Sequence, residues 1–375
     1  MTVSAESGSR PDASASTTDP RSLALLTTMR VGGPARRTVT AHTAAQIVAA
    51  VRAADDAGEP LLVVSGGSNL LVADEGFDGT VVRIASRGVD VESGVDGSGV
   101  TLRVAAGEPW DEFVARTVAE GWAGIEALSG IPGLTGATPI QNVGAYGQDV
   151  SQTIVAVQAW DRQEQRQLHF AAADCGFAYR HSLFKDTMTG ASPRYVVVDV
   201  TYRLELADLS RPLAYADLAR GLGVELGARV PLADARAAVL EQRRRRGMVL
   251  DAGDHDTWSC GSFFTNPILT AADFAELSDQ VQRRLGPDVV LPGFPDPDGR
   301  VKTSAAWLID KAGFSKGHGL PGPAALSTKH TLALTNRGEA SAADLIALAR
   351  EVRNGVESAF GVRLVNEPVL VGLTL

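Results

Sequence analysis

The chain has 375 residues and a formal net charge of -9 at pH 7, and 45% of its residues are hydrophobic. This length allows two or three domains with sizeable cores. The negative charge argues against nucleic acid as the main partner, and the lack of a long apolar run argues against a membrane partner. Two isolated cysteines and six histidines without ligand spacing predict neither a disulfide framework nor a metal site.

Residues 1–20 are rich in small and polar residues. They lack both the basic region and the apolar core of a secretory signal peptide. We therefore expect a disordered tail and a cytoplasmic protein. Nothing in the remaining pattern signals an obligate interface, so the expected state is a monomer.

After the tail, a strand, a helix and a second strand lead into a short glycine loop. We predict the first strand at residues 37–41, a helix capped by Thr43 that ends near Gly58, a strand at residues 61–64, and the loop SGGSNLL at residues 65–71. This order is typical of nucleotide-binding units. However, the glycines neither follow the GxGxxG spacing nor open a helix, which disfavours a Rossmann site.

A longer glycine loop occupies residues 129–149, SGIPGLTGATPIQNVGAYGQD. Its five glycines and two prolines exclude a regular helix or strand. It also carries apolar side chains, which a solvated linker would lack. One interpretation is a tight structural loop, and the other is a backbone that brings N–H groups close to a phosphate-bearing ligand. The presence of two such loops favours the ligand.

β-rich runs surround the long loop. We predict strands at residues 80–85, 100–106, 154–160, 166–170 and 195–206, a turn-rich segment at 91–99, and a helix that starts at Pro109 and stops at Gly121. The last two strands enclose CGFAYRHSLFKD, in which Tyr179, Arg180, Ser182 and Lys185 are candidates to line a pocket. For Arg180, a plain surface position is the alternative.

A second region begins near residue 207. Its predicted helices cover residues 215–218, 232–246, 271–285, 304–312 and 341–360, and a strand is predicted at 326–334. The second helix ends in four arginines at residues 243–246. A cationic C-terminus complements the helix dipole, so a solvated helix end is the simplest interpretation, and attraction of a diphosphate is the alternative.

Two polar residues in this region have two interpretations each. Ser262, in SCGSFFTNP, has no GxSxG elbow around it and no histidine placed nearby, so the local pattern favours a turn residue over a hydrolase nucleophile. Glu367 interrupts the apolar run at the C-terminus. It is either an exposed hairpin residue or a buried and paired carboxylate, and the pattern alone does not separate the two.

Seven motifs of the chain resemble those of the UDP-N-acetylenolpyruvylglucosamine reductase family, the MurB-type flavoenzymes. In chain order they are RVGGPA, SGGSNLLV, SGIPG with GATPIQNVGAYG, YRHSLFK, GMVLD, GSFFTNP and NEPVL. The resemblance runs from about Thr27 to the end. It implies an α+β fold with a vanillyl-alcohol-oxidase-type (PCMH-type) FAD-binding domain of two α+β subdomains and a C-terminal α/β substrate-binding domain. The implied boundaries are 21–85 for the first subdomain, with 367–375 returning to it, 86–206 for the second, and 207–366 for the substrate domain.

The resemblance also implies the reaction. NADPH reduces FAD, and the reduced flavin reduces the enolpyruvyl group of UDP-N-acetylglucosamine enolpyruvate to the lactyl ether of UDP-N-acetylmuramate, in peptidoglycan precursor synthesis. Hydride from the flavin N5 leaves an enolate that Arg180 and Glu367 stabilise, and Ser262 supplies the proton. The preference for NADPH over NADH rests on the family alone, because no pocket for the 2′-phosphate is recognisable.

The motifs carry binding residues over as well. The implied cofactor-binding residues are Arg30, Gly32, Gly33, Ser65, Gly66, Gly67, Ser68, Asn69, Leu70, Ser129, Ile131, Pro132, Gly133, Gly136, Ala137, Gln141, Asn142, Gly144, Ala145 and Tyr146. The implied substrate-binding residues are Tyr179, Tyr215, Arg246 and Asn266, with Lys302 or Lys316 as further candidates. Where some members read KLPDP before the serine motif, this chain reads RRGMVLDAGDHDTW, so Arg246 is the candidate for the family's substrate-binding lysine.

Two other functions compete with this one. An oxidase of the same fold would use oxygen and an alcohol, but neither glycine loop has a histidine or cysteine motif suited to covalent flavin attachment. A catalytically silent protein that binds flavin or a UDP-sugar would not need Arg180, Ser262 and Glu367 together. The resemblance therefore favours the reductase.

Overall fold

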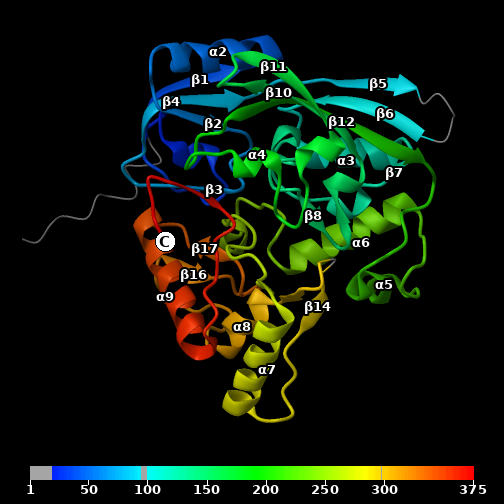
Figure 1. The fold of residues 1–375 in the computed structure, drawn as a ribbon, viewed down its shortest axis with the longest axis vertical. Helices are drawn as coiled ribbons and strands as arrows, with labels where there is room; N and C mark the ends of the chain where they lie inside the picture. Colours follow the sequence, from blue (N-terminus) through cyan, green and yellow to red (C-terminus); the bar gives the residue numbers. More distant parts are fainter. Residues whose placement is uncertain (1–18, 94–98, 297) are drawn as a thin grey trace, which may run out of the picture.

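The computed structural model describes residues 19–93, 99–296 and 298–375 (Figure 1). Residues 1–18 of the predicted tail lie outside the described residues, as do residues 94–98 of the predicted turn. The larger sheets occupy the upper half of Figure 1, and helices α7, α8 and α9 occupy the lower half. None of the helices in the described ranges combines the length and the apolar character that a bilayer span requires.

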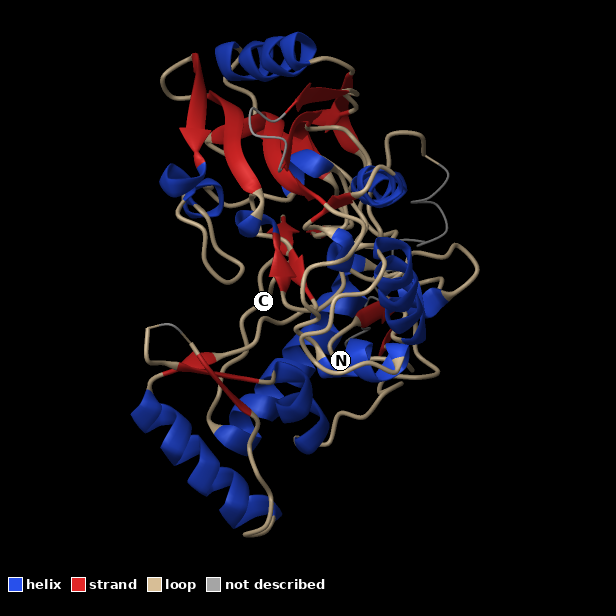
Figure 2. Cartoon of the chain, turned by 90° about the vertical axis from the view of Figure 1, so that its right-hand side faces the viewer, coloured by secondary structure: helices blue, strands red, loops and turns tan. Residues whose placement is uncertain are grey.

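The first sheet is parallel, in the order β1-β4-β2. Its strands are β1 (Ala35–Ala41), β4 (Phe77–Ile84) and β2 (Leu61–Val64). Helix α2 (Ala44–Asp56) connects β1 to β2 and lies across the top of the sheets in Figures 1 and 2. The Thr43 hydroxyl caps α2 by accepting a hydrogen bond from a first-turn amide. The predicted strand–helix–strand order is therefore confirmed.

The second sheet is antiparallel, in the order β11-β10-β12-β6-β5, with β7 paired to β12. Its strands are β5 (Val89–Ser93), β6 (Gly99–Ala105), β7 (Trp122–Ala123), β10 (Ile154–Asp161), β11 (Arg166–Ala171) and β12 (Tyr195–Leu206). Helix α3 (Trp110–Ala119) packs on the sheet through Trp110 and Phe113, whose ring centroids lie 6.0 and 5.5 Å from that of Tyr202. Residues 91–93 of the predicted turn belong to β5, because pairing with β6 overrides the local turn preference.

The C-terminus of the chain returns to the short glycine loop. Strand β18 (Val369–Val371) pairs in parallel with β3 (Leu70–Val72), which continues from that loop. The Val369 amide also donates to the Asn69 carbonyl at 2.9 Å. Because Glu367 lies two residues before β18, this pairing places Glu367 beside the loop, where its carbonyl accepts from the Asn69 side chain.

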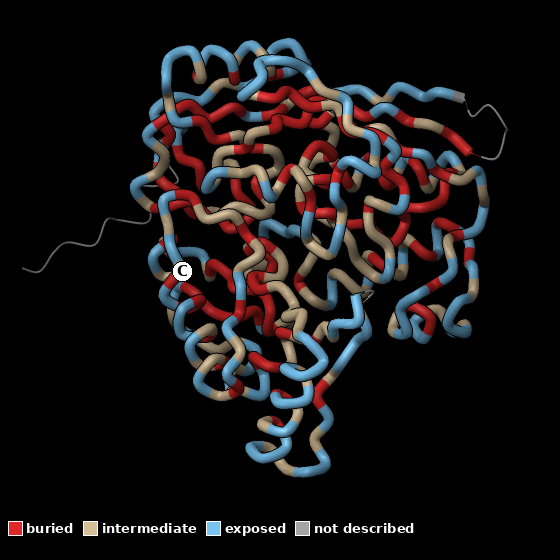
Figure 3. Tube along the Cα trace, in the orientation of Figure 1, coloured by how far each residue is buried: buried red, intermediate tan, exposed pale blue. Residues whose placement is uncertain are grey.

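The lower half is built around helix α9 (Ala342–Phe360), whose buried face includes the predicted Leu345, Val352 and Val356. Ser341 begins α9 in a capping box. The elements around it are α7 (Ala271–Leu285), α8 (Ala305–Lys311), β13 (Ile268–Leu269), β14 (Gly293–Pro295), β15 (Val301–Thr303), β16 (Ala324–Leu326) and β17 (Leu334–Asn336). Figure 3 shows that buried segments concentrate along the strands of the upper half and in the interior of the lower half.

One predicted element of the lower half is wrong. Residues 326–334 do not form a continuous strand, because the chain turns back between β16 and β17, which pair with each other in antiparallel fashion. The apolar residues that gave this run its strand-like composition are buried: Leu326, Leu332 and Leu334 all lie in the core. Their burial comes from packing beneath α9 and not from an extended backbone.

Candidate active site

The two glycine loops, which are far apart in the sequence, are in direct contact. A Cβ added to Gly66 would lie 2.5 Å from the Gly133 Cα, closer than any real side chain allows. The Ser68 hydroxyl donates to the Pro132 carbonyl at 2.9 Å. Glycine at residue 66 is therefore required for the close approach that joins the two loops into one wall.

A cavity of about 130 Å³ lies beside this wall, and we call it the cofactor cavity. The predicted cofactor-binding residues that line it are Ser65, Gly66, Gly67, Ser68, Asn69, Leu70, Gly136, Ala137 and Gln141. The rest of its lining is mostly apolar and includes Phe184 and Val197. The Ser65 hydroxyl oxygen is buried there without a hydrogen-bond partner among the described residues. The apolar lining and the one unpaired polar atom suit part of a flat ligand with polar edges, such as FAD, while a volume of about 130 Å³ is too small for the whole cofactor.

The other predicted cofactor-binding residues lie outside this cavity. Ile131, Pro132 and Gly144 line a neighbouring cavity. The residues that line neither are Arg30, Gly32, Gly33, Ser129, Gly133, Asn142, Ala145 and Tyr146. Several of them have structural contacts: a Cβ at Gly33 would lie 2.0 Å from the Asp74 carbonyl oxygen, and the Arg30 guanidinium stacks on Trp258 at 3.9 Å. Their role in cofactor binding stays a prediction.

The neighbouring cavity, of about 180 Å³, holds all three predicted catalytic residues, and we call it the catalytic cavity. Arg180 comes from the segment after β11, Ser262 from the segment before β13, and Glu367 from the residues before β18. The catalytic cavity shares with the cofactor cavity Ser68, Asn69 and Gln141. A reaction at Ser262 would therefore take place beside a ligand of the cofactor cavity.

Arg180 and Glu367 form an ion pair in the catalytic cavity. The Arg180 Nε lies 2.9 Å from the Glu367 Oε1, and the two side chains are 23% and 16% exposed. The Arg180 Nη atoms donate to the carbonyls of Asn142 at 3.2 Å and Gly144 at 2.9 Å, both in the long glycine loop. Burial raises the pKa of Glu367, and the charges of Arg180 and Lys185 oppose this shift. The alternatives of a surface Arg180 and an exposed Glu367 are wrong.

Lys185 supports the backbone of Arg180. Arg180 has a φ of 52°, in a region that few residues other than glycine adopt. The Lys185 ammonium donates to the Arg180 carbonyl at 2.9 Å and to the side-chain oxygen of Gln141 at 3.2 Å. Burial lowers the pKa of Lys185, and the charge of Glu367 opposes this shift. The structure thus links Lys185 to the catalytic pair and to a residue of the cofactor cavity.

Ser262 is presented by a segment that two buried phenylalanines hold in place. Phe263 and Phe264 are each 1% exposed, and their ring centroids lie 5.1 Å apart. The Phe263 amide donates to the Leu332 carbonyl, and the Phe263 carbonyl accepts from the Glu367 amide, both at 2.8 Å. Ser262 therefore lies in an irregular segment, and backbone hydrogen bonds of its neighbour Phe263 tie that segment to Glu367.

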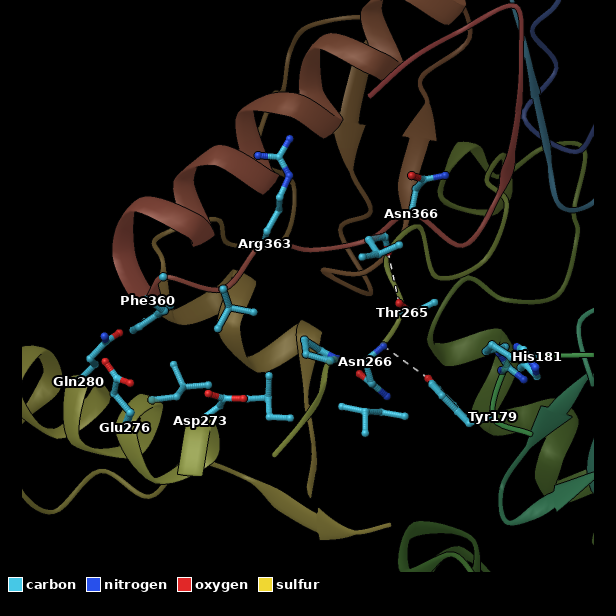
Figure 4. A pocket seen from close by; sticks show the side chains of 18 of the residues that line it. Tyr179, His181, Thr265, Asn266, Asp273, Glu276, Gln280, Phe360, Arg363 and Asn366 are labelled. Carbon is cyan, nitrogen blue, oxygen red and sulfur yellow. Dashed lines mark hydrogen bonds between the residues drawn. The ribbon is translucent and has the colours of Figure 1, made fainter. Parts of the chain in front are cut away.

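A larger groove of about 720 Å³, drawn in Figure 4, adjoins the catalytic cavity. Arg180 lines both of them. Tyr179 and Asn266 lie on its wall, and Figure 4 shows the Tyr179 hydroxyl accepting from the Asn266 amide at 3.5 Å. The Asn266 side chain is held by the Ala305 amide at 3.0 Å. The Lys302 ammonium lies 4.7 Å from the centre of the Tyr179 ring. Two of the predicted substrate-binding residues are thus brought together, with Lys302 beside them.

The remaining substrate candidates lie elsewhere. Tyr215 and Arg246 line neither the groove nor the catalytic cavity. Tyr215, at the start of α5 (Ala216–Leu222), is 39% exposed and packs edge-to-face on Tyr146 with ring centroids 5.3 Å apart. Arg246 lies 6.0 Å from the Tyr215 ring centre and pairs with Asp217 at 3.0 Å. Tyr215 and Arg246 therefore form a separate pair, and Lys316 is exposed.

The four arginines at the end of α6 (Leu232–Arg245) do not form a uniformly solvated helix end. Arg244 and Arg245 are exposed, as predicted. Arg246 is partly buried in its pair with Asp217. Arg243 lines the catalytic cavity. The prediction is therefore wrong for Arg243 and Arg246, and Arg243 is the residue of the cavity that local sequence reasoning missed.

Known proteins similar to this chain first identify the class of protein to which it belongs. A model of the FAD-binding domain family matches residues 35–166, which contain both glycine loops. Among solved structures, the UDP-N-acetylenolpyruvylglucosamine reductase of Thermus caldophilus is similar, with a TM-score of 0.62 over 93% of this chain and 97% of that chain, and with 23% identity. The predicted fold, with its vanillyl-alcohol-oxidase-type FAD-binding domain, is confirmed. The chain is a flavoprotein of this fold.

Closer relatives then define the family. The family model described as the C-terminal domain of UDP-N-acetylenolpyruvoylglucosamine reductase matches residues 253–371. The enzyme of that name from Streptomyces coelicolor is 61% identical over 355 residues, which cover 94% of this chain and 90% of that protein. The one from Thermobifida fusca is 59% identical over 353 residues, which cover 94% of this chain and 97% of that protein. The chain belongs to the UDP-N-acetylenolpyruvoylglucosamine reductase family.

Proposed function

We propose that the chain is an NADPH-dependent reductase that converts UDP-N-acetylglucosamine enolpyruvate into UDP-N-acetylmuramate. Family membership supports a reductase that holds FAD. The observation that carries the finer assignment is that Arg180, Ser262 and Glu367 face one cavity, which shares part of its wall with the cofactor cavity. A cation, a hydroxyl and a carboxylate thus lie next to the place where a cofactor fits.

The walls of the cofactor cavity suit FAD. The two glycine loops offer backbone that no Cβ obstructs, and the enclosed Ser65 hydroxyl beside the cavity has no hydrogen-bond partner among the described residues. We assign the holding of FAD to residues 65–70 together with Gly136, Ala137 and Gln141. When bound there, FAD supplies to the substrate the hydride that it has received from NADPH.

Arg180 and Glu367 act on the charge that develops on the substrate. Hydride addition to the terminal carbon of the enolpyruvyl group leaves negative charge on the neighbouring carbon, and this charge spreads into the carboxylate. Two loop carbonyls and Glu367 fix the Arg180 guanidinium before the substrate arrives, so its stabilisation requires little reorganisation. Glu367 donates a hydrogen bond to the same charge once it takes up a proton, and burial, which raises its pKa against the opposing charges of Arg180 and Lys185, makes that uptake easier.

Ser262 completes the reaction by giving its hydroxyl proton to the carbon that bears the charge. A hydroxyl is a weak acid, but an enolate carbon is a strong base, so the transfer is favourable. Tyr179 and Asn266 bind the UDP-sugar in the adjoining groove.

An anaerobic experiment tests the proposal. The purified protein is reduced with NADPH, UDP-N-acetylglucosamine enolpyruvate is added, and the flavin absorbance is followed. Rapid reoxidation with formation of the lactyl product is the expected result. Reduction without reoxidation by this substrate would overturn the assigned substrate, and protein purified without flavin would overturn the assignment of the glycine loops.

A further inference from the structure

Helix periodicity places Arg243 on the buried face of α6. The buried residues of α6 are Leu232, Ala235 and Val239, and a further step of four residues reaches Arg243. Arg244 and Arg245 point away from this face and are exposed. A cationic side chain thus occupies a position where the pattern of the helix calls for an apolar one.

The contacts of Arg243 leave much of its guanidinium unpaired. One Nη donates to the Met248 carbonyl at 2.7 Å. The Nε is enclosed, packs near Gly130 and has no hydrogen-bond partner among the described residues. Burial lowers the pKa of Arg243, and the interactions with Tyr146 and Asp111 partly oppose this shift. The side chain is thus a largely desolvated cation with one neutral acceptor.

The carboxylate of Asp111, whose charge acts on Arg243, is paired with another arginine. Asp111 accepts from Arg236 through both oxygens, at 2.7 and 2.9 Å, and from the Gly130 amide at 2.5 Å. On the other side, Arg246 is paired with Asp217. Neither acid forms an ion pair with Arg243 within the described ranges.

The charges around the catalytic cavity do not balance. Its described lining contains two guanidinium groups, those of Arg180 and Arg243, and one carboxylate, Glu367. Glu367 is paired with Arg180. Keeping a desolvated cation without a counter-charge is costly, so a protein retains one where a ligand supplies the missing anion.

We propose that Arg243 is an anion-binding residue of the catalytic cavity, which pairs with a negatively charged oxygen that enters the cavity with a ligand. This inference rests on the proposed function, which offers two sources of such an oxygen: the carboxylate of the UDP-sugar substrate and the reduced cofactor. Arg180 donates to two loop carbonyls through its Nη atoms and is ion-paired with Glu367, whereas Arg243 has one neutral acceptor and no ion pair within the described ranges. Arg243 is therefore the cation of the cavity without a counter-charge, and it receives the incoming anion beside Arg180.

The test compares Arg243→Met with Arg244→Met in the flavin-loaded enzyme. Both variants remove one charge from the same helix, and Arg244 is exposed. Two quantities are measured: the dissociation constant of UDP-N-acetylglucosamine enolpyruvate for the oxidised enzyme, by titration calorimetry, and the midpoint potential of the bound flavin without substrate. Loss of one charge-assisted contact should weaken anion binding by about 10- to 100-fold. Arg244→Met should change neither quantity.

The two measurements identify the source of the anion. A weaker substrate affinity with an unchanged potential places the anion on the UDP-sugar, and a lower potential with unchanged affinity places it on the reduced cofactor. Unchanged affinity and potential in Arg243→Met would overturn the proposal and leave Arg243 as a structural support of Met248.

If Arg243→Met does not fold, Arg243→Lys replaces it, because it keeps the charge but loses the Nε and the fork geometry. Wild-type affinity and potential in Arg243→Lys would then refute a directional contact of the guanidinium with the anion. Failure of the wild type to bind the UDP-sugar would contradict the proposed substrate, while the potential would still test Arg243.

Discussion

Replacing Ser262 with alanine tests the proton donor most directly. Ser262 lines the catalytic cavity, and its hydroxyl makes no hydrogen bond within the described ranges. Its backbone position is fixed by the contacts of Phe263, which the substitution leaves in place. The change removes one oxygen and orphans no buried group, so the free energy of unfolding should change by less than about 0.5 kcal/mol.

The effect on the reaction should be far larger and confined to one half of it. Removal of a positioned proton donor slows proton transfer by about 10²- to 10⁴-fold, which corresponds to about 3–5 kcal/mol in the barrier. Reduction of the bound flavin by NADPH needs no proton from Ser262. That half-reaction should therefore keep its wild-type rate, while reoxidation by the UDP-sugar slows by the whole factor.

Anaerobic stopped-flow absorbance measures the two half-reactions separately on the same protein. Ser358→Ala, which changes an exposed serine of α9, is the matched control and should leave both rates unchanged. Equal losses in both half-reactions of Ser262→Ala, or a clear fall in its Tm, would show that Ser262 acts through the structure. Either result would refute the reasoning.

Two further predictions concern the glycine loop and the pH dependence of stability. Gly67→Ala should abolish flavin retention, because a Cβ there would lie 1.7 Å from the Leu26 carbonyl oxygen. The control Gly58→Ala has a similar positive φ and no atom within 4 Å of its added Cβ, so it should keep its flavin. The flavin absorbance of the two purified variants tests this difference. Burial lowers the pKa of His330 from 6.5 to about 4, so the unfolded chain takes up a proton first and stability falls as the pH drops through this window. The loss should approach about 3 kcal/mol. Urea unfolding at pH 7 and pH 4.5 should show that His330→Asn removes most of this loss of stability. The control His42→Asn changes an exposed histidine and should keep the loss. A wild-type pH dependence in His330→Asn would contradict the assignment of the loss to His330.

Local structure followed from the sequence because its causes lie among neighbouring residues. The apolar spacing of α7 and α9 predicted their bounds to within one residue, and Ser341 marked the start of α9. The density of glycine predicted irregular backbone in the two loops, and this is wrong in part. The long loop contains a 3₁₀ helix at Thr135–Ala137 and the paired two-residue strands β8 (Gly144–Ala145) and β9 (Gln148–Asp149), and β3 begins inside the short loop. The catalytic residues came from the resemblance to a family, since local patterns alone favoured a surface Arg180 and a turn at Ser262.

Only the tertiary structure decided how the charged residues are paired. Whether Glu367 is exposed or buried depends on β18 pairing with β3 and on Arg180, which comes from a distant part of the chain. Arg243 resembles its neighbours in sequence, and its burial depends on which face of α6 meets the long glycine loop. The cost of desolvating a charge is set by the partners that the whole fold brings to it, and short-range patterns contain no information about those partners.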